Sequence, residues 1–160
     1  MTLDAKQREW PGRPGARVAW PPVTRFVVDC GAALRLAAEE VEVPAEHELL
    51  APTLLRSQTL SALHGAVHRG ELPADAARDR LARVQALPIR LLGDAVLRRR
   101  AWEVADRLGW AETYDAEYVA LAQLQADALV TVDPELARRV EGVVATATID
   151  ELAAALARVT

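Results

Sequence analysis

Hydrophobic and polar positions follow two patterns from residue 23 onward, short apolar runs and longer amphipathic stretches. The runs VTRFVVD, PIRLLG, ALVTVD and VVATA are rich in β-branched and aliphatic residues, which is typical of buried strands. The segment around Pro44 is predicted to be a loop, and Pro134 is predicted to begin a short helix. Apolar residues spaced three or four positions apart predict longer helices over about 31–40, 53–69, 74–87, 95–108, 114–125 and 149–159.

Residues that favour helix ends support these boundaries. Gly70 and Gly109 follow two of the helices, and glycine readily adopts the left-handed conformation that ends a helix. Asp94 and Thr113 precede two others and are suited to cap them. Strands that alternate with helices predict one α/β domain with a mainly parallel central sheet, flanked by helices on both faces in three layers.

Residues 1–22 follow neither pattern. They contain four of the nine prolines, two glycines, and Trp10 and Trp20, with no helical or alternating period. We interpret this segment as a flexible extension of a domain that spans residues 23–160. The two tryptophans offer a means of contacting the domain or a partner.

The composition is that of an ordinary globular protein of 160 residues, 51% hydrophobic and 26% charged. The net charge of −4 and the lack of a Lys/Arg-rich tail mean that any anionic partner requires a local patch or a metal. Cys30 is the only cysteine, which excludes an internal disulfide and a cysteine-based zinc cluster. Without a signal-peptide pattern or an apolar run of roughly 18 residues, the sequence predicts a cytoplasmic protein with no membrane association.

Aspartates follow two of the predicted strands. Asp29 ends VVD and Asp133 ends VTVD, and the carboxyl ends of parallel strands meet at one edge of a sheet, where such folds place their sites. Asp115 lies in the first turn of the helix that leads into the second of these strands. Three carboxylates at one edge repel one another, and a divalent cation relieves the repulsion. Oxygen ligands of this kind suit Mg²⁺ or Mn²⁺.

Each acid also has a purely structural interpretation. Asp29 and Asp133 are suited to cap the helices that follow them, and Asp115 complements a helix dipole. Glu117 points to the far side of the same helix, so Asp115 faces inward when Glu117 faces water. Asp127 is best interpreted as a turn residue.

The strings FVVDC, LLAPTLLRSQTLSAL, TYDAEYVALA and ALVTVD, in this order and spacing, resemble the PIN-domain ribonucleases of the VapC-type toxin group. The resemblance runs from about residue 23 to the end of the chain, and YDAEYVALA followed by LVTVD is its most specific part. It implies an α/β sandwich around a parallel sheet and a Mg²⁺-dependent endoribonuclease. It also implies a homodimer and an antitoxin whose tail fills the active-site groove.

By this resemblance, Asp29, Asp115 and Asp133 match the acidic metal ligands of the family. Two positions depart from its pattern. Gln58 stands where the family commonly has glutamate, and Gly31 stands where it commonly has serine or threonine. An amide orients a water or contacts a metal weakly, but it cannot accept a proton as a carboxylate does. With one carboxylate fewer than the family pattern, the site is expected to bind metal more weakly and to hold one ion rather than two. An ordinary helix-surface role for Gln58 is the alternative.

Other candidates are few. His64 and His68 lie four residues apart on one predicted helix, but no third zinc ligand is apparent. The run of arginines 98–100 offers phosphate contacts or simply forms a solvated helix face. Arg69 lies near the Gln58 side of its helix, which predicts an RNA phosphate contact. No dinucleotide or P-loop motif occurs, and a phospho-acceptor domain needs a lysine near its site, whereas Lys6 is the only lysine.

The sequence therefore favours a Mg²⁺-dependent endoribonuclease, the toxin of a type II toxin–antitoxin pair. In this mechanism Asp29 and Asp115 hold the ion, Asp133 binds it directly or through water, and Gln58 positions the attacking water. The alternative is a catalytically weakened PIN domain that acts as an RNA-binding or regulatory interaction module. A structural subunit without a metal is a third hypothesis.

Overall fold

The computed structural model describes residues 24–154, and the centre of this region is a five-stranded sheet in which every neighbouring pair is parallel. The strand order is β3-β2-β1-β4-β5. The strands are β1 (Thr24–Val28), β2 (His47–Pro52), β3 (Ile89–Leu92), β4 (Ala128–Val130) and β5 (Thr146–Ala147). The helices are α1 (Cys30–Ala38), α2 (Leu54–His68), α3 (Ala74–Ala86), α4 (Ala95–Leu108), α5 (Tyr114–Gln125), α6 (Pro134–Arg139) and α7 (Ile149–Ala154).

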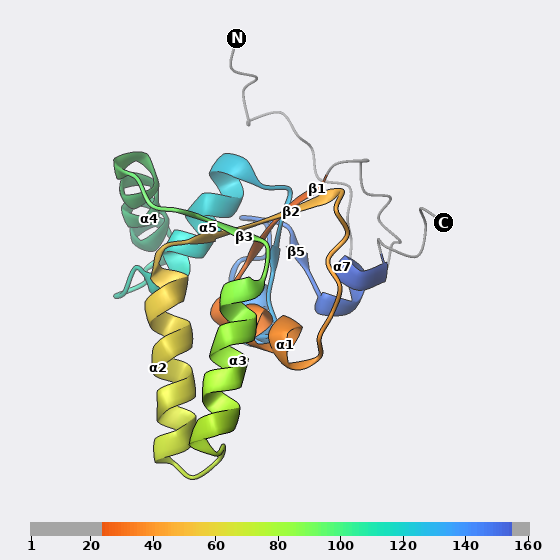
Figure 1. Cartoon of the computed structure of the whole chain (residues 1–160). Helices are drawn as coiled ribbons and strands as arrows, with labels where there is room; N and C mark the ends of the chain where they lie inside the picture. Colours follow the sequence, from red (N-terminus) through yellow and green to blue (C-terminus); the bar gives the residue numbers. More distant parts are fainter. Residues whose placement is uncertain (1–23, 155–160) are drawn as a thin grey trace.

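Helices cover both faces of the sheet. The helices α1, α2 and α3 pack against one another, whereas α5 packs on β1, β2 and β4 and carries α4 on its outer side. Right-handed connections between parallel strands place these two groups on opposite faces. Figure 1 shows α2 and α3 side by side, extending beyond the sheet as a pair. The chain is therefore an α/β three-layer sandwich, as the alternation of strands and helices predicts.

The core lies between the sheet and these helices. Phe26, Val27 and Val28 of β1 are completely buried, which is typical of a central parallel strand covered on both faces. Tyr118 is the largest of the side chains in the described region that are almost fully buried, and α5 brings it under the sheet. The rigid centre of the sheet thus positions the loops that follow β1 and β4.

The helices agree with the predicted ranges except at their ends. Gly109 adopts the left-handed conformation (φ 69°) that ends α4, and the carboxylate of Asp94 accepts a hydrogen bond from the Leu97 N–H at the other end of the helix. Thr113 precedes α5 without a side-chain cap. The proposed extension 1–22 lies outside the described residues, as does the part of the last helix beyond residue 154.

Strand β2 is not among the predicted strands: the sequence indicates only a loop around Pro44, whereas residues 47–52 form a strand between β1 and β3. The strand begins with His47 and Glu48, which interrupt the apolar pattern that signals a strand. Glu48 pairs with Arg25 of β1 and Arg90 of β3, so both neighbouring strands accommodate its charge. The strand VVATA is confirmed only in part, since β5 contains Thr146 and Ala147.

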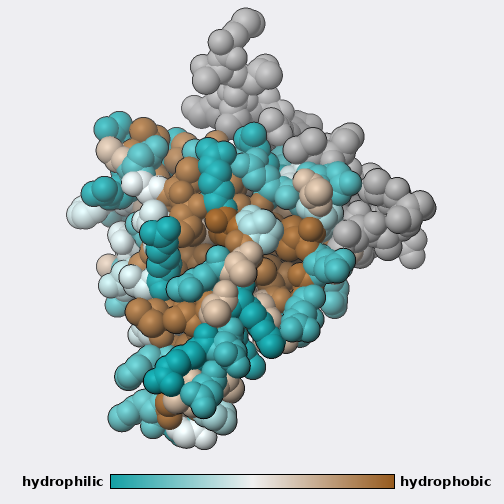
Figure 2. Space-filling view, in the orientation of Figure 1, coloured by the Kyte–Doolittle hydropathy of each residue, from teal (hydrophilic) through white to brown (hydrophobic). Residues whose placement is uncertain are grey.

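Figure 2 shows apolar residues gathered over the middle of one face, while the projecting end of the α2–α3 pair is mainly hydrophilic. Among residues 24–154, none of the helices combines the length and the apolar character needed to cross a membrane.

Candidate functional site

The order of the strands reverses between β1 and β4, and the region beyond the carboxyl ends of these two strands is called the crevice below. From β1 the chain moves to β2 and β3 on one side, and it then crosses back to add β4 and β5 on the other. Parallel sheets bind ligands outside the carboxyl ends of their strands at such a reversal point. Asp29 directly follows β1, and Asp133 lies three residues after β4, so both predicted acids flank this crevice.

Asp29 is held in place by the start of α1. It is 8% exposed, and its Oδ1 accepts a hydrogen bond of 2.8 Å from the Ala32 N–H, so it caps the helix. Burial raises the pKa of Asp29 above its ordinary value, and hydrogen bonds from Thr131 and Ala32 offset part of that rise. The negative charges of Asp115 and Asp133 raise it further. The three acids therefore interact electrostatically, and a buried carboxylate in such surroundings favours a cation.

Asp133 is connected to Asp29 through Thr131. The Thr131 side chain is buried, hydrogen-bonds to Asp29, and accepts a hydrogen bond of 3.1 Å from the Asp133 N–H. The Asp133 carboxylate itself caps α6 by accepting from the Glu135 N–H at 2.9 Å. The capping interpretation is thus correct for both acids, and it leaves one oxygen of each carboxylate outside the cap. Thr131 is not among the predicted site residues, although it stands inside the run VTVD.

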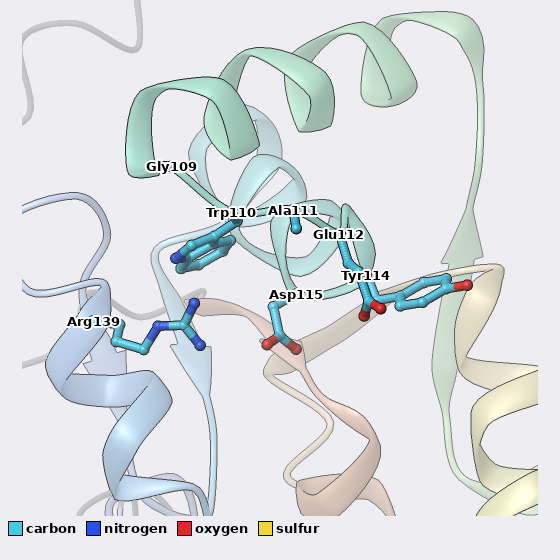
Figure 3. A pocket seen from close by; sticks show the side chains of 7 residues that line it. All are labelled: Gly109, Trp110, Ala111, Glu112, Tyr114, Asp115 and Arg139. Carbon is cyan, nitrogen blue, oxygen red and sulfur yellow. The ribbon is translucent and has the colours of Figure 1, made fainter.

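Asp115 lies in the first turn of α5, as predicted. It lines a hollow of about 290 Å³ together with residues from the end of α4 and from α6. Desolvation raises the pKa of Asp115, the positive charge of Arg139 lowers it, and the charges of Asp133 and Glu112 raise it again. In Figure 3 the Asp115 carboxylate and the Arg139 guanidinium lie next to each other.

Gln58 reaches the acids through Tyr118. The phenol O–H of Tyr118 donates a hydrogen bond of 2.5 Å to Oε1 of Gln58, joining α5 to α2. Burial raises the pKa of Tyr118, and the charges of Asp29 and Asp115 contribute to the rise, so the phenol lies within electrostatic range of the site. The amide oxygen keeps a second lone pair, so Gln58 offers its N–H groups as donors and this lone pair as an acceptor. The predicted role, in which Gln58 positions the attacking water, stays a prediction.

The remaining predicted residues are not brought to the crevice. Arg69 directly follows the last residue of α2 and lies eleven residues beyond Gln58, which corresponds to about 16 Å along the helix axis. Its guanidinium binds Glu71 with hydrogen bonds of 2.7 and 3.1 Å. His64 and His68 are exposed on the same helix. The structure therefore gives no support to Arg69 as a contact near the acids.

The predicted arginine run and the turn residue have local roles. Arg100 pairs with Glu103 on α4, and Arg98 lies close enough to Glu117 to lower its pKa against the effect of burial. Asp127 accepts a hydrogen bond of 2.9 Å from the Arg25 N–H, which ties the turn before β4 to β1. These contacts agree with a solvated helix face and with a turn aspartate.

The arrangement of the acids decides which divalent cation they fit. Within residues 24–154, no set of three or more histidine, cysteine, aspartate or glutamate side chains is arranged closely enough to hold a metal ion. Mg²⁺ makes a smaller demand, since it keeps several waters and needs only one or two carboxylates. Burial raises the pKa of the neighbouring Cys30 thiol to about 11, so it stays protonated at neutral pH. The donors at the crevice are therefore hard oxygens, which fit Mg²⁺ bound largely through water.

Gly31 has a steric explanation. A Cβ atom at this position would lie 2.7 Å from Cγ2 of Val132, in the loop that follows β4. The side chain that the resemblance implies at this position therefore has no room while Val132 occupies the space. Gly31 and Val132 form a complementary pair beside Asp29.

We expect Gly31→Ala to destabilise the protein by about 1 kcal/mol. Crowding against Val132 costs about 1–3 kcal/mol, and the better helix propensity of alanine recovers about 0.5–1 kcal/mol. In a Val132→Ala background the same change is expected to be neutral or stabilising, because the crowding is gone. Urea unfolding of the four proteins measures the coupling. An equal cost in both backgrounds would show that Val132 does not explain the glycine.

No family model matches the sequence, and no curated protein gives a significant match. Among solved structures, the chain is similar to the crystal structure of PAE2754 from Pyrobaculum aerophilum, with a TM-score of 0.66 and 26% sequence identity. The similarity covers 84% of this chain and 96% of that one. It supports the α/β sandwich, and the function has to be argued from the site.

Proposed function

We propose that the protein is a Mg²⁺-dependent endoribonuclease that hydrolyses RNA phosphodiester bonds at the crevice between β1 and β4. The observation that carries the proposal is the electrostatic interaction of Asp29, Asp115 and Asp133 at this reversal point of the sheet. Maintaining three interacting acids in one place is costly unless a cation joins them. The resemblance to PIN-domain ribonucleases supports RNA as the substrate.

In this proposal Asp29 and Asp115 would hold Mg²⁺, and Asp133 would bind it directly or through water. When bound, the ion makes water more acidic and neutralises negative charge at the reacting phosphate. The hydrogen bonds from Ala32 and Thr131 orient the Asp29 carboxylate, and α6 orients that of Asp133. Such preorganisation avoids rearrangement during the reaction.

Gln58 acts as a hydrogen-bond donor in this mechanism. Tyr118 holds its amide oxygen, so the amide N–H groups are available to a phosphate oxygen or to the oxygen of the attacking water. Each cleavage consumes one water and leaves one phosphate monoester and one hydroxyl end.

Incubation of RNA with the purified protein in Mg²⁺, Mn²⁺ or excess EDTA tests the proposal. We expect cleavage with either metal and none with EDTA, which also distinguishes this activity from contaminating ribonucleases that need no metal. A substrate that stays intact with both metals, under conditions where the protein is folded, would overturn the proposed activity.

A second candidate function follows from Gln58, whose engaged amide cannot act as a general base. In this alternative the chain is a weakened PIN domain that binds RNA or a regulatory partner without cutting. RNA binding without cleavage, combined with cleavage by Gln58→Glu, would favour it.

The proposed physiological role is that of a toxin, with a homodimeric assembly and a cognate antitoxin as partner. Expression of the protein alone is expected to arrest growth, and co-expression of a small protein from the adjacent reading frame is expected to restore it. Normal growth despite accumulation of the folded, RNA-cleaving protein would refute the toxin role and leave the enzymatic proposal intact.

A further inference from the structure

The hollow beside Asp115 contains a cation that the mechanism above does not use. It opens between the end of α4, the start of α5 and α6. The residues that line it are Gly109, Trp110, Ala111, Glu112, Tyr114, Asp115 and Arg139. In Figure 3, Arg139 lies against Trp110 on one side of the hollow, while the Tyr114 ring points away from this pair.

Arg139 is oriented by an aromatic ring. Its guanidinium carbon lies 4.6 Å from the centroid of the Trp110 ring, which is a cation–π contact. Within residues 24–154, no carboxylate lies within 4.0 Å of this guanidinium, although its charge acts on Asp115. The adjacent Arg138 differs, since it is paired with Glu135 at 2.5 Å. The guanidinium N–H groups of Arg139 are thus available to bind an anion.

The position of Trp110 is determined by the end of α4. Gly109 takes the left-handed conformation, and the Trp110 N–H then donates a hydrogen bond of 2.8 Å to the Ala105 carbonyl oxygen. The Trp110 side chain is half-buried against the core. A stacked guanidinium on such a fixed ring loses little freedom on binding, and its planar fork matches the oxygens of a phosphate.

We propose that Arg139, stacked on Trp110, binds a phosphodiester group of the RNA strand next to the one that is cut. This inference rests on the proposed ribonuclease function. In it, Arg139 is the group that directs the RNA strand into the crevice. Asp115 and Glu112 line the same hollow, so a negatively charged strand requires a cation here. Arg139 is the cationic residue of this hollow, and it lies beside Asp115.

Fluorescence anisotropy with labelled single-stranded RNA in EDTA, where no cleavage occurs, measures the contact. Arg139→Gln is expected to weaken binding about tenfold and to reduce the slope of log K against log salt by about 1. Arg138→Gln is the matched control and is expected to change binding less than about twofold, because Glu135 already pairs with that arginine. Arg139→Lys is expected to recover only part of the affinity, because lysine lacks the planar fork.

Equal affinities of the Arg139→Gln and Arg138→Gln proteins would overturn the inference, and so would full affinity of Arg139→Lys. If RNA is cleaved normally while these affinities are equal, the phosphate contact fails and the ribonuclease proposal stands. If RNA binds through Arg139 but is never cleaved with Mg²⁺ or Mn²⁺, the contact stands and the ribonuclease proposal fails. Failure of the wild type to bind RNA would overturn both.

Discussion

Asp29→Asn is expected to reduce RNA cleavage by more than about 100-fold. Changes to residues that only support a metal ligand already cost about 10–100-fold, and Asp29 is proposed to be a ligand itself. Asparagine keeps an oxygen that accepts from the Ala32 N–H, so the cap of α1 is preserved. The cleavage rate at saturating Mg²⁺, compared with the wild type from the same purification, measures the effect. Cleavage by Asp29→Asn at the wild-type rate would show that Asp29 is not a metal ligand of the active site.

The difference in folding stability between Asp29→Asn and the wild type is expected to depend on pH. Burial raises the pKa of Asp29 above 3.8, so the folded protein keeps this proton to higher pH than the unfolded chain. Ionisation of Asp29 therefore costs stability as the pH rises through the interval between the unfolded and folded values. In EDTA, the stability of Asp29→Asn relative to the wild type is expected to grow from pH 3.5 to pH 7. A relative stability that falls over this range would contradict the direction of the pKa shift.

Gln58→Glu is expected to increase cleavage at limiting Mg²⁺ by about tenfold, because a further carboxylate strengthens the attraction for the ion. The new carboxylate is expected to accept the hydrogen bond from Tyr118, a phenol on which the charges of Asp29 and Asp115 act. Without metal the added repulsion destabilises the fold, so the melting temperature in EDTA is expected to fall. Mg²⁺ is expected to raise it by more than in the wild type.

Gln58→Met is the matched control for this change. It keeps the length of the side chain without a charge or a hydrogen bond, so it separates loss of the Tyr118 contact from gain of a carboxylate. We expect slower cleavage and unchanged dependence of the melting temperature on Mg²⁺. If Gln58→Glu shows no change in either metal response or cleavage, the side chain at position 58 does not face the ion.

The acidic edge of the site could be predicted from local sequence. Aspartates directly after apolar runs identify strand ends, and parallel strands bring their ends together, so Asp29 and Asp133 could be placed from the pattern alone. Their capping bonds also follow from local sequence. What the local pattern could not give is the strand order that makes β1 and β4 neighbours.

The partners of these acids depend on long-range contacts. Tyr118 and Gln58 are separated by 60 residues and meet only through the tertiary fold, which brings α5 to α2. Trp110 and Arg139 belong to different helical connections, and neither stands in a recognisable motif. Arg69 shows another limit of local sequence, since two residues on one face of a helix lie far apart when several turns separate them. An RNA contact by Arg69 stays a prediction. Strand β2 was missed because it begins with the polar residues His47 and Glu48. The arginines of the two neighbouring strands that pair with Glu48 become its neighbours only in the folded protein.

Calorimetric titration of Mg²⁺ into the wild-type protein tests the central claim most directly, namely that Asp29 and its neighbouring acids form a cation site. The account predicts uptake of one ion per chain, and it predicts that Asp29→Asn and Asp115→Asn each abolish or strongly weaken that uptake. Mn²⁺ is expected to bind at the same site. Absence of Mg²⁺ and Mn²⁺ uptake by the folded wild type, or uptake unchanged in both variants, would contradict the account.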